Sequence, residues 1–116
     1  VDTSDSIARF LDDVGCDNLG VNLQVPLADG EDPIASATRL GPHVIHLHAN
    51  NHTVDRKHTF LRQGEIDFEA FVRAVRSAGP FDGYISVEHA YHHPVWQTAV
   101  VEADYLGQLI PRLEGE

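Results

Sequence analysis

Three short runs of this sequence alternate apolar and polar side chains with a period of two, as strands exposed on one face do. They are LGVNLQV at 19–25, VIHLH at 44–48 and YISVE at 84–88. Segments of helical periodicity separate the runs, which predicts an α/β fold with parallel strands. Because helices cover both faces of a doubly wound sheet, its strands are apolar throughout. The alternation, with polar residues near the carboxyl end of each strand, therefore favours a barrel whose inner face ends in a solvent-filled opening at the carboxyl ends of the strands.

Four segments have the periodicity and the end signals of amphipathic helices. The first spans 4–14, with Thr3 or Ser4 as its cap, and stops at Gly15. The second opens at Asp32-Pro33 and closes at 41–42. The other two are expected to bury apolar stripes, one of Phe68, Phe71, Val72 and Val75, and one of Val95, Ala99, Val100, Ala103, Leu106 and Ile110. We expect Pro111 to end the last helix, because proline lacks the N–H of a helix interior.

Size and charge narrow the classes of function. With 116 residues and 42% apolar content, the chain can bury one core, so we expect residues 1–116 to form a single domain. A formal net charge of −10 would repel nucleic acid and anionic membranes, so neither is an expected partner. No apolar run is long enough to span a membrane and no signal segment opens the chain, which predicts a cytoplasmic protein. The single Cys16 has no partner for an internal disulfide.

Two histidines lie two residues apart in the second of the alternating runs. Because alternate residues of a strand share a face, we expect His46 and His48 beside Val44, with Ile45 and Leu47 on the opposite face. His48, nearer the carboxyl end, is a candidate metal ligand, although a hydrogen-bonded strand histidine fits the same pattern. His46 lies one layer deeper, where support of its neighbour or plain filling is expected.

The side chains at the ends of the three strands, Gln24, His48 and Glu88, would converge in the mouth of a barrel. Imidazole nitrogen and carboxylate oxygen are suitable ligands for a divalent metal ion. Glu88 is the stronger candidate, because a carboxylate is costly to bury unless it is paired or coordinated; partial exposure on a rim is its alternative. Three further histidines fit a loop or a cap better than a site: His89, His92 and His93.

The polar segment from 49 to 65 is longer than an ordinary connection, which indicates a functional loop, a short extra strand, or both. Within it, Asp55 and His58 are candidate metal ligands, at a spacing that ordinary loop residues also show. Arg56 and Arg62 belong to the one cationic stretch of this acidic chain and are candidates for binding an anionic group of a substrate. A solvated loop explains these cations equally well.

Four stretches together resemble the xylose isomerase-like TIM barrels, the family of sugar phosphate isomerases and epimerases that includes type 2 abasic-site endonucleases. NLGVNLQ is similar to the fifth strand, VIHLHANN to the sixth with its metal-binding histidine, QGEIDFEAFVRAV to a glycine-containing turn into a helix, and FDGYISVEHA to the eighth strand with its glutamate. The resemblance implies half of a (β/α)8 barrel, strands five to eight with their helices. It also implies that His48 and Glu88 bind a divalent ion (Mn, Mg, Zn or Co), and that Glu88 lies beside the substrate carbon that loses a proton.

Several positions depart from the family pattern. The fifth strand normally ends in a metal-binding aspartate with a histidine three residues later, where this chain has Gln24 and Leu27. An amide oxygen is a weaker ligand than a carboxylate, so Gln24 is expected as a weakened ligand or as a contact to a substrate hydroxyl. Asp55 and His58 resemble the aspartate-x-histidine of the endonuclease branch with one residue too many. Strands one to four, with their glutamate, have no counterpart, and no methionine occurs even at position 1, so we expect a fragment of a longer chain.

The resemblance implies a metal-dependent sugar or sugar phosphate isomerase or epimerase that removes a proton next to a carbonyl. The alternative is a non-catalytic or degenerate half-barrel that binds a carbohydrate or a protein partner, and Gln24 and Leu27 favour it. An endonuclease is disfavoured by the acidic charge. Half a barrel leaves strand edges unpaired, so a homo-oligomer, most simply a pair of copies, is expected beside the sugar substrate.

Overall fold

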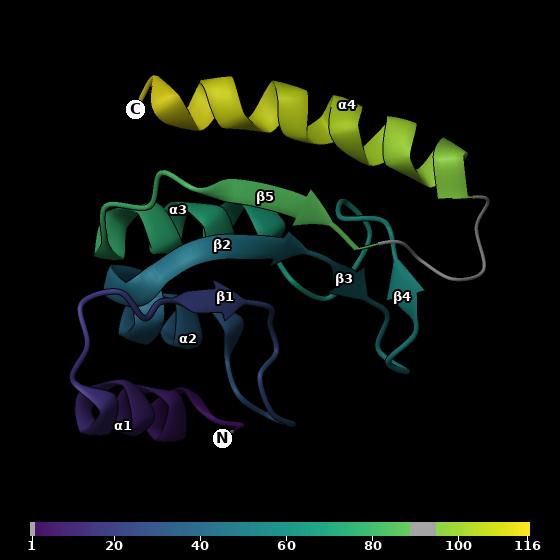
Figure 1. Cartoon of the computed structure of the whole chain (residues 1–116). Helices are drawn as coiled ribbons and strands as arrows, with labels where there is room; N and C mark the ends of the chain where they lie inside the picture. Colours follow the sequence, from purple (N-terminus) through teal and green to yellow (C-terminus); the bar gives the residue numbers. More distant parts are fainter. Residues whose placement is uncertain (1, 89–94) are drawn as a thin grey trace. The chain divides into compact units, whose positions relative to one another are not determined.

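The computed structural model describes residues 2–88 and 95–116 and has the α/β order that the sequence predicts (Figure 1). Its elements are α1 (Ser4–Val14), β1 (Val21–Leu23), α2 (Pro33–Leu40), the 3-10 turn η1 (Gly41–His43), β2 (Val44–Ala49), β3 (Asn51–His52), β4 (His58–Thr59), α3 (Phe68–Ala78), β5 (Tyr84–Val87) and α4 (Val95–Glu114). Among the described helices, none combines the length and hydropathy that crossing a bilayer requires. His89, His92 and His93 lie outside the described residues.

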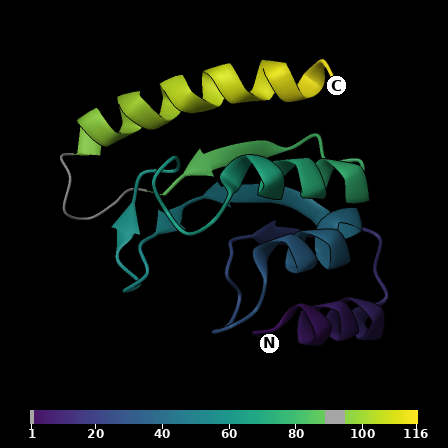
Figure 2. The ribbon, with the colours of Figure 1, turned by 180° about the vertical axis from the view of Figure 1, so that it is seen from behind.

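The chain divides into two compact units, Val1–His48 with Ala70–Ser86, and Ala49–Glu69 with Val87–Glu116. The first is built on a three-stranded sheet in the order β1-β2-β5. Strands β1 and β2 pair in parallel, and the three arrows of this sheet point the same way in Figure 1. Figure 2 shows α2 and α3 together on one face of the sheet. Among the described helices of this unit, none covers the opposite face.

Local signals place the helices of the first unit. Thr3 caps α1 in a capping box with Ser6, and Gly15 closes the helix in a left-handed conformation with φ of 66°. The Asp32 carboxylate caps α2 by accepting from the Ala35 backbone N–H at 2.9 Å. The apolar stripe predicted for α3 is confirmed, because all four of its side chains are buried: Phe68, Phe71, Val72 and Val75.

The face predicted for Val44 is wrong, because the pairing of β1 with β2 shifts by one residue at Ile45. The paired residues are Val21 with Val44, Asn22 with His46, and Leu23 with Leu47. Val44 therefore lies on the buried helix side with Leu47, and Ile45, at the irregularity, is 62% exposed. His46 and His48 share the other face, as predicted.

The second unit contains a short hairpin within the long polar segment, which confirms the expected extra strand. Strands β3 and β4 pair antiparallel, with Asn51 opposite Thr59 and His52 opposite His58. At the turn between them, Arg56 adopts a left-handed φ of 67°. The Thr53 backbone N–H closes this turn by donating to the Lys57 carbonyl at 2.8 Å.

Helix α4 is longer than predicted, because Pro111 lies inside it instead of ending it. A proline inside a helix loses the hydrogen bond of its missing N–H and crowds the carbonyl four residues earlier, but the Pro111 carbonyl still accepts from the Gly115 N–H at 3.2 Å. Burial of Leu109 and Leu113 on either side of the proline stabilises the last turns. Tertiary burial thus outweighs the local signal.

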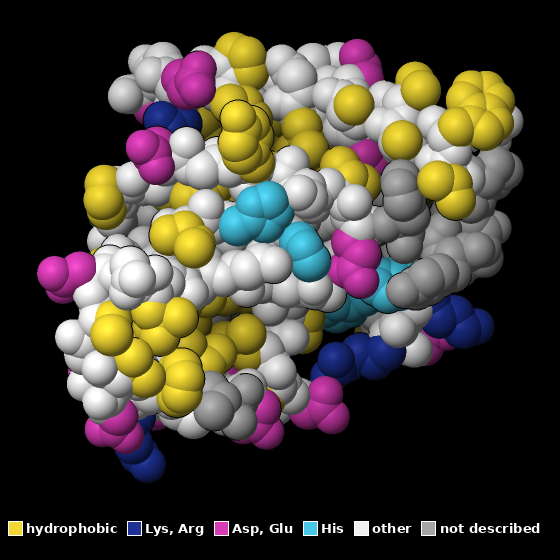
Figure 3. Space-filling view, in the orientation of Figure 1, with side chains coloured by type: hydrophobic (Ala, Val, Ile, Leu, Met, Phe, Trp, Pro, Cys, Tyr) yellow, Lys and Arg dark blue, Asp and Glu magenta, His cyan; other side chains and the backbone are white. Residues whose placement is uncertain are grey.

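The buried face of α4 also differs from the predicted apolar stripe. Its buried side chains are Thr98, Glu102, Leu109 and Leu113. Val95 and Val100 of the predicted stripe are exposed, and so are the neighbouring Trp96 and Val101. Figure 3 shows hydrophobic side chains along this helix.

Candidate functional site

The face of the β1-β2-β5 sheet opposite α2 and α3 carries a row of polar side chains, which we name the sheet-face cluster. Its members are Asn22, Gln24, His46, His48 and Ser86. They share a face because side chains alternate along each strand and because the pairing places Asn22 beside His46. Figure 3 shows histidine side chains gathered over β2 on this face. The cluster extends to the carboxyl ends of the strands, as the sequence predicts for Gln24 and His48.

Both ring nitrogens of His48 have partners on β1 or just after it. The Gln24 Oε1 lies 2.9 Å from Nδ1, and the Asn22 Nδ2 lies 3.4 Å from Nε2. An amide oxygen only accepts and an amide nitrogen only donates, so Nδ1 of the neutral ring carries the hydrogen. Among the described residues, Nε2 has one long contact, to Asn22, so Nε2 is the metal-binding atom that His48 offers.

His46 supports the ring of His48 from the side. The two ring centres are 5.7 Å apart and the rings meet edge to face, at an interplanar angle of 81°. The Nε2 atom of His46 is hydrogen-bonded to the Ser86 hydroxyl at 2.8 Å. Strand alternation predicts Ser86 on this face, and its contact with His46 ties β5 to β2.

Glu88 follows β5 and belongs to the second unit. Its backbone N–H donates to the carbonyl of Ala49, the last residue of β2, at 2.9 Å. Its side chain is half-buried, and Oε2 is buried with no hydrogen-bond partner among the described residues. A buried carboxylate oxygen without a partner is costly. A cation or a hydroxyl donor from a ligand would satisfy it.

The described residues contain no group of three or more histidine, cysteine, aspartate or glutamate side chains close enough to hold a metal ion. The donor chemistry of His48 and Glu88 nevertheless fits two positions of such a site, through an imidazole lone pair and a carboxylate oxygen. That His48 and Glu88 share one ion stays a prediction.

The two loop candidates for metal ligation lie in the β3–β4 hairpin. Asp55 is in the exposed turn, where it accepts from the Thr53 hydroxyl and pairs with Lys57 at 3.5 Å. The hydrogen bond from Thr53 is the main reason that the pKa of Asp55 lies below its ordinary value. His58 lies in β4, opposite His52. Metal ligation by Asp55 and His58 stays a prediction.

The two candidate arginines differ in their surroundings. Arg56 is exposed in the hairpin turn. The Arg62 guanidinium lies over the ring of Tyr105, 4.8 Å from its centre, and its Nη2 donates to Gln108 Oε1 at 3.4 Å. Arg62 thereby attaches the loop after β4 to α4. Contact of Arg56 or Arg62 with a substrate stays a prediction.

Sequence reasoning missed a buried polar network in the second unit, which we name the Asn51 network. Asn51 is fully buried and donates to the carbonyls of Leu61 and Ile66, both at 2.8 Å. Its Oδ1 accepts from the backbone N–H of Ile66 at 3.0 Å and of His52 at 2.9 Å. These four bonds join the loop between β4 and α3 to β3.

Glu102 on α4 completes the Asn51 network. It is 3% exposed, and its Oε2 accepts from the Leu61 N–H at 2.9 Å. Burial raises the pKa of Glu102, against smaller opposing effects of the Leu61 hydrogen bond and of the Arg62 charge. Glu102 lies at helical spacing from Leu109 and Leu113, and this spacing was the signal in the sequence for its burial. The signal was missed because a charged residue is not expected at a buried position.

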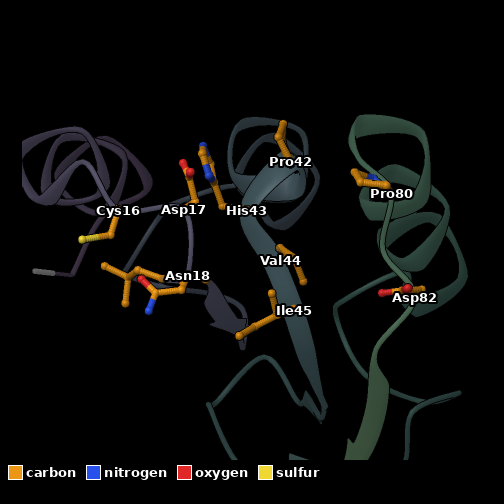
Figure 4. A pocket seen from close by; sticks show the side chains of 11 residues that line it. Cys16, Asp17, Asn18, Pro42, His43, Val44, Ile45, Pro80 and Asp82 are labelled. Atoms are coloured by element: carbon orange, nitrogen blue, oxygen red, sulfur yellow. The ribbon is translucent and has the colours of Figure 1, made fainter.

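A pocket of about 490 Å³ opens at the amino-terminal ends of the strands, away from the sheet-face cluster (Figure 4). Asp17 projects from the loop before β1, His43 from η1 and Asp82 from the loop before β5. Cys16 points away from the other side chains. Active sites of parallel barrels lie at the carboxyl ends of the strands, whereas this end serves stability. The sheet-face cluster and Glu88 are therefore the better candidates for chemistry.

Comparisons with known proteins agree with this fold. The family model described as "Xylose isomerase-like TIM barrel" matches residues 1–109. Among solved structures, the crystal structure of a xylose isomerase domain protein from Planctomyces limnophilus is similar, with a TM-score of 0.81 at 19% sequence identity. The match covers 98% of this chain and 45% of that chain, so this chain spans less than half of its relative. Among curated proteins, none matches.

Proposed function

We propose a function from the premise that this chain belongs to the xylose isomerase-like TIM barrel family. Its α/β fold with a parallel sheet corresponds to part of such a barrel. The proposed activity is that of a metal-dependent sugar or sugar phosphate isomerase or epimerase, of which this chain forms the carboxyl-terminal half. The observation that carries the proposal is the buried Oε2 of Glu88, which follows a barrel strand and has no hydrogen-bond partner among the described residues.

In the proposed mechanism, Glu88 removes the proton from the carbon next to the substrate carbonyl. The family commonly depends on a divalent metal ion, which would be held here by His48 Nε2 and the Glu88 carboxylate. Such an ion supplies stabilisation of the negative charge that develops on the substrate oxygens. Arg56 or Arg62 would bind an anionic group of the substrate, and the amide nitrogen of Gln24 would donate to a substrate hydroxyl.

A calorimetric titration of this chain with Zn²⁺ tests the proposal. We expect the His48→Ala, Glu88→Ala double variant to bind Zn²⁺ at least about 100-fold more weakly than the wild type, because both proposed ligands are removed. His43→Ala is the matched control, since it removes an exposed histidine from η1, directly before β2. Equal affinity of the double variant and the wild type would contradict the metal-dependent activity.

A second candidate is a half-barrel that binds a carbohydrate or a protein partner without turnover. It is favoured by the lack of a group of three metal donors among the described residues, and by the engagement of Gln24 Oε1 with His48. Exchange of a substrate proton with deuterated water separates the two candidates. Saturable sugar binding without any exchange, in the presence of a divalent ion, would favour this second candidate.

A second copy of the chain is the proposed protein partner. Strands β1 and β5 form the two edges of the sheet, and such edges favour pairing with another chain. Twofold association would pair these edges and cover the exposed sheet face. Light scattering at micromolar concentration should give the mass of a dimer, and a monomeric mass would contradict the pairing.

A further inference from the structure

We propose that Gln24 is a positioning residue, which fixes the tautomer of His48 so that the Nε2 lone pair is presented at the carboxyl end of the sheet. The use of that lone pair for a metal ion rests on the proposed function. The tautomer itself depends only on contacts within the first unit. Sequence comparison with the family suggested a weakened metal ligand at this position, and the geometry points to a different role.

The hydrogen-bond chemistry allows one arrangement. A neutral imidazole has one N–H, and the Gln24 Oε1 at 2.9 Å from Nδ1 can only accept. The hydrogen is therefore on Nδ1, and Nε2 keeps its lone pair. The Asn22 amide donates to Nε2 over 3.4 Å, a long contact that a ligand can displace at small cost.

The arrangement is held by the backbone pairing of two strands. Leu23 pairs with Leu47, so the next residues, Gln24 and His48, stand beside each other on the opposite face. The ring of His46, whose centre is 5.7 Å from that of His48, limits the movement of His48 on one side. Gln24 thus contacts a ring whose position is already restricted.

This geometry separates a positioning residue from a ligand. An amide oxygen that accepts from Nδ1–H at 2.9 Å is directed at the ring, and ligation of an ion by the same oxygen would compete with that bond. A metal-binding histidine ordinarily donates its other N–H to such an acceptor, which orients the ring and raises its basicity. Loss of the acceptor typically weakens metal binding 10–100-fold.

The first readout is the tautomer in the metal-free chain. Long-range ¹H–¹⁵N NMR at about pH 8, above the ordinary histidine pKa, reports which ring nitrogen carries the hydrogen. We expect Nδ1–H for His48 in the wild type, in Gln24→Glu, whose carboxylate also accepts, and in the control Asn22→Leu. We expect Gln24→Leu, with its similar volume and no acceptor, to lose the single tautomer while its circular dichroism is unchanged.

The second readout is Zn²⁺ affinity by calorimetry. We expect Gln24→Leu to bind 10–100-fold more weakly than the wild type, and Gln24→Glu to restore the affinity. An Nε2–H tautomer in the wild type, or an unchanged tautomer in Gln24→Leu, overturns the proposal. Weaker binding by Gln24→Leu without a change of tautomer would identify Gln24 as a ligand and also overturn it. Absence of Zn²⁺ binding in the wild type would contradict the proposed function alone, since the tautomer is measured without metal.

Discussion

The sheet-face cluster around His48 and the Asn51 network consist of similar groups, yet burial gives them opposite roles. In the cluster, side chains bond mainly to other side chains, the members are partly exposed, and the His48 Nε2 has one long contact among the described residues. In the network, Asn51 is fully buried and every described bond satisfies a backbone group. A ligand can replace bonds in the first at little cost, whereas each broken bond in the second leaves a buried group unsatisfied.

The largest expected effect comes from Asn51→Ala. It leaves the carbonyls of Leu61 and Ile66 and the Ile66 N–H without their side-chain partner, at about 1–3 kcal/mol for each buried group. We expect the free energy of unfolding to fall by about 3 kcal/mol or more, as measured by urea denaturation. Asn22→Ala in the sheet-face cluster is the control and should cost less than about 1 kcal/mol. Equal losses in the two variants would remove the distinction between cluster and network.

A smaller effect is expected from Gly64→Ala, which tests how firmly Asn51 is held. A Cβ at position 64 would clash with the Asn51 side chain, and that side chain cannot move without breaking its four hydrogen bonds. We expect a loss of about 1–3 kcal/mol in the free energy of unfolding. The matched control is Gly107→Ala in α4, where a Cβ meets nothing within 4 Å and should stabilise by up to about 1 kcal/mol. An unchanged free energy of unfolding in Gly64→Ala would mean that the Asn51 side chain can move without loss of stability.

The smallest expected effect concerns pH. The raised pKa of Glu102 means that the folded chain binds this proton more tightly than the unfolded chain. The contribution of Glu102 to the free energy of unfolding therefore falls as pH rises from its ordinary pKa of 4.5 through its raised pKa in the folded chain. The fall is at most about 1.4 kcal/mol per pH unit. Glu102→Gln keeps an acceptor for Leu61 and removes this dependence. Urea unfolding of both proteins between about pH 4.5 and pH 8 checks it, and parallel stability curves would show that Glu102 is ionised without penalty.

The sequence was sufficient for elements whose signals are local. The caps at Thr3 and Asp32 and the stripe of α3 lie within a few residues of the structure they specify. The sharing of one face by His46 and His48 follows from alternation alone. The contact of Gln24 with the ring of His48 does not, because the two residues are 24 positions apart and meet only through strand pairing.

Two of the three errors of the sequence interpretation, the face of Val44 and the buried face of α4, have one physical origin. Alternation predicted the face of Val44, but the register between β1 and β2 shifts at Ile45. Apolar periodicity predicted the buried face of α4, but Glu102 turns inward to accept from Leu61, 41 residues earlier in the chain. In both cases a distant partner outweighed the local pattern.

Short-range chemistry in the chain therefore specified the caps of α1 and α2, the parallel α/β order and the polar face of β2, because these depend on neighbours within about one helical turn or one strand. Only the folded structure decided the register of β2, the inward face of α4 and the partners of Asn51 and His48. Those features depend on which distant groups are buried together, and burial is a property of the packed molecule rather than of any single segment.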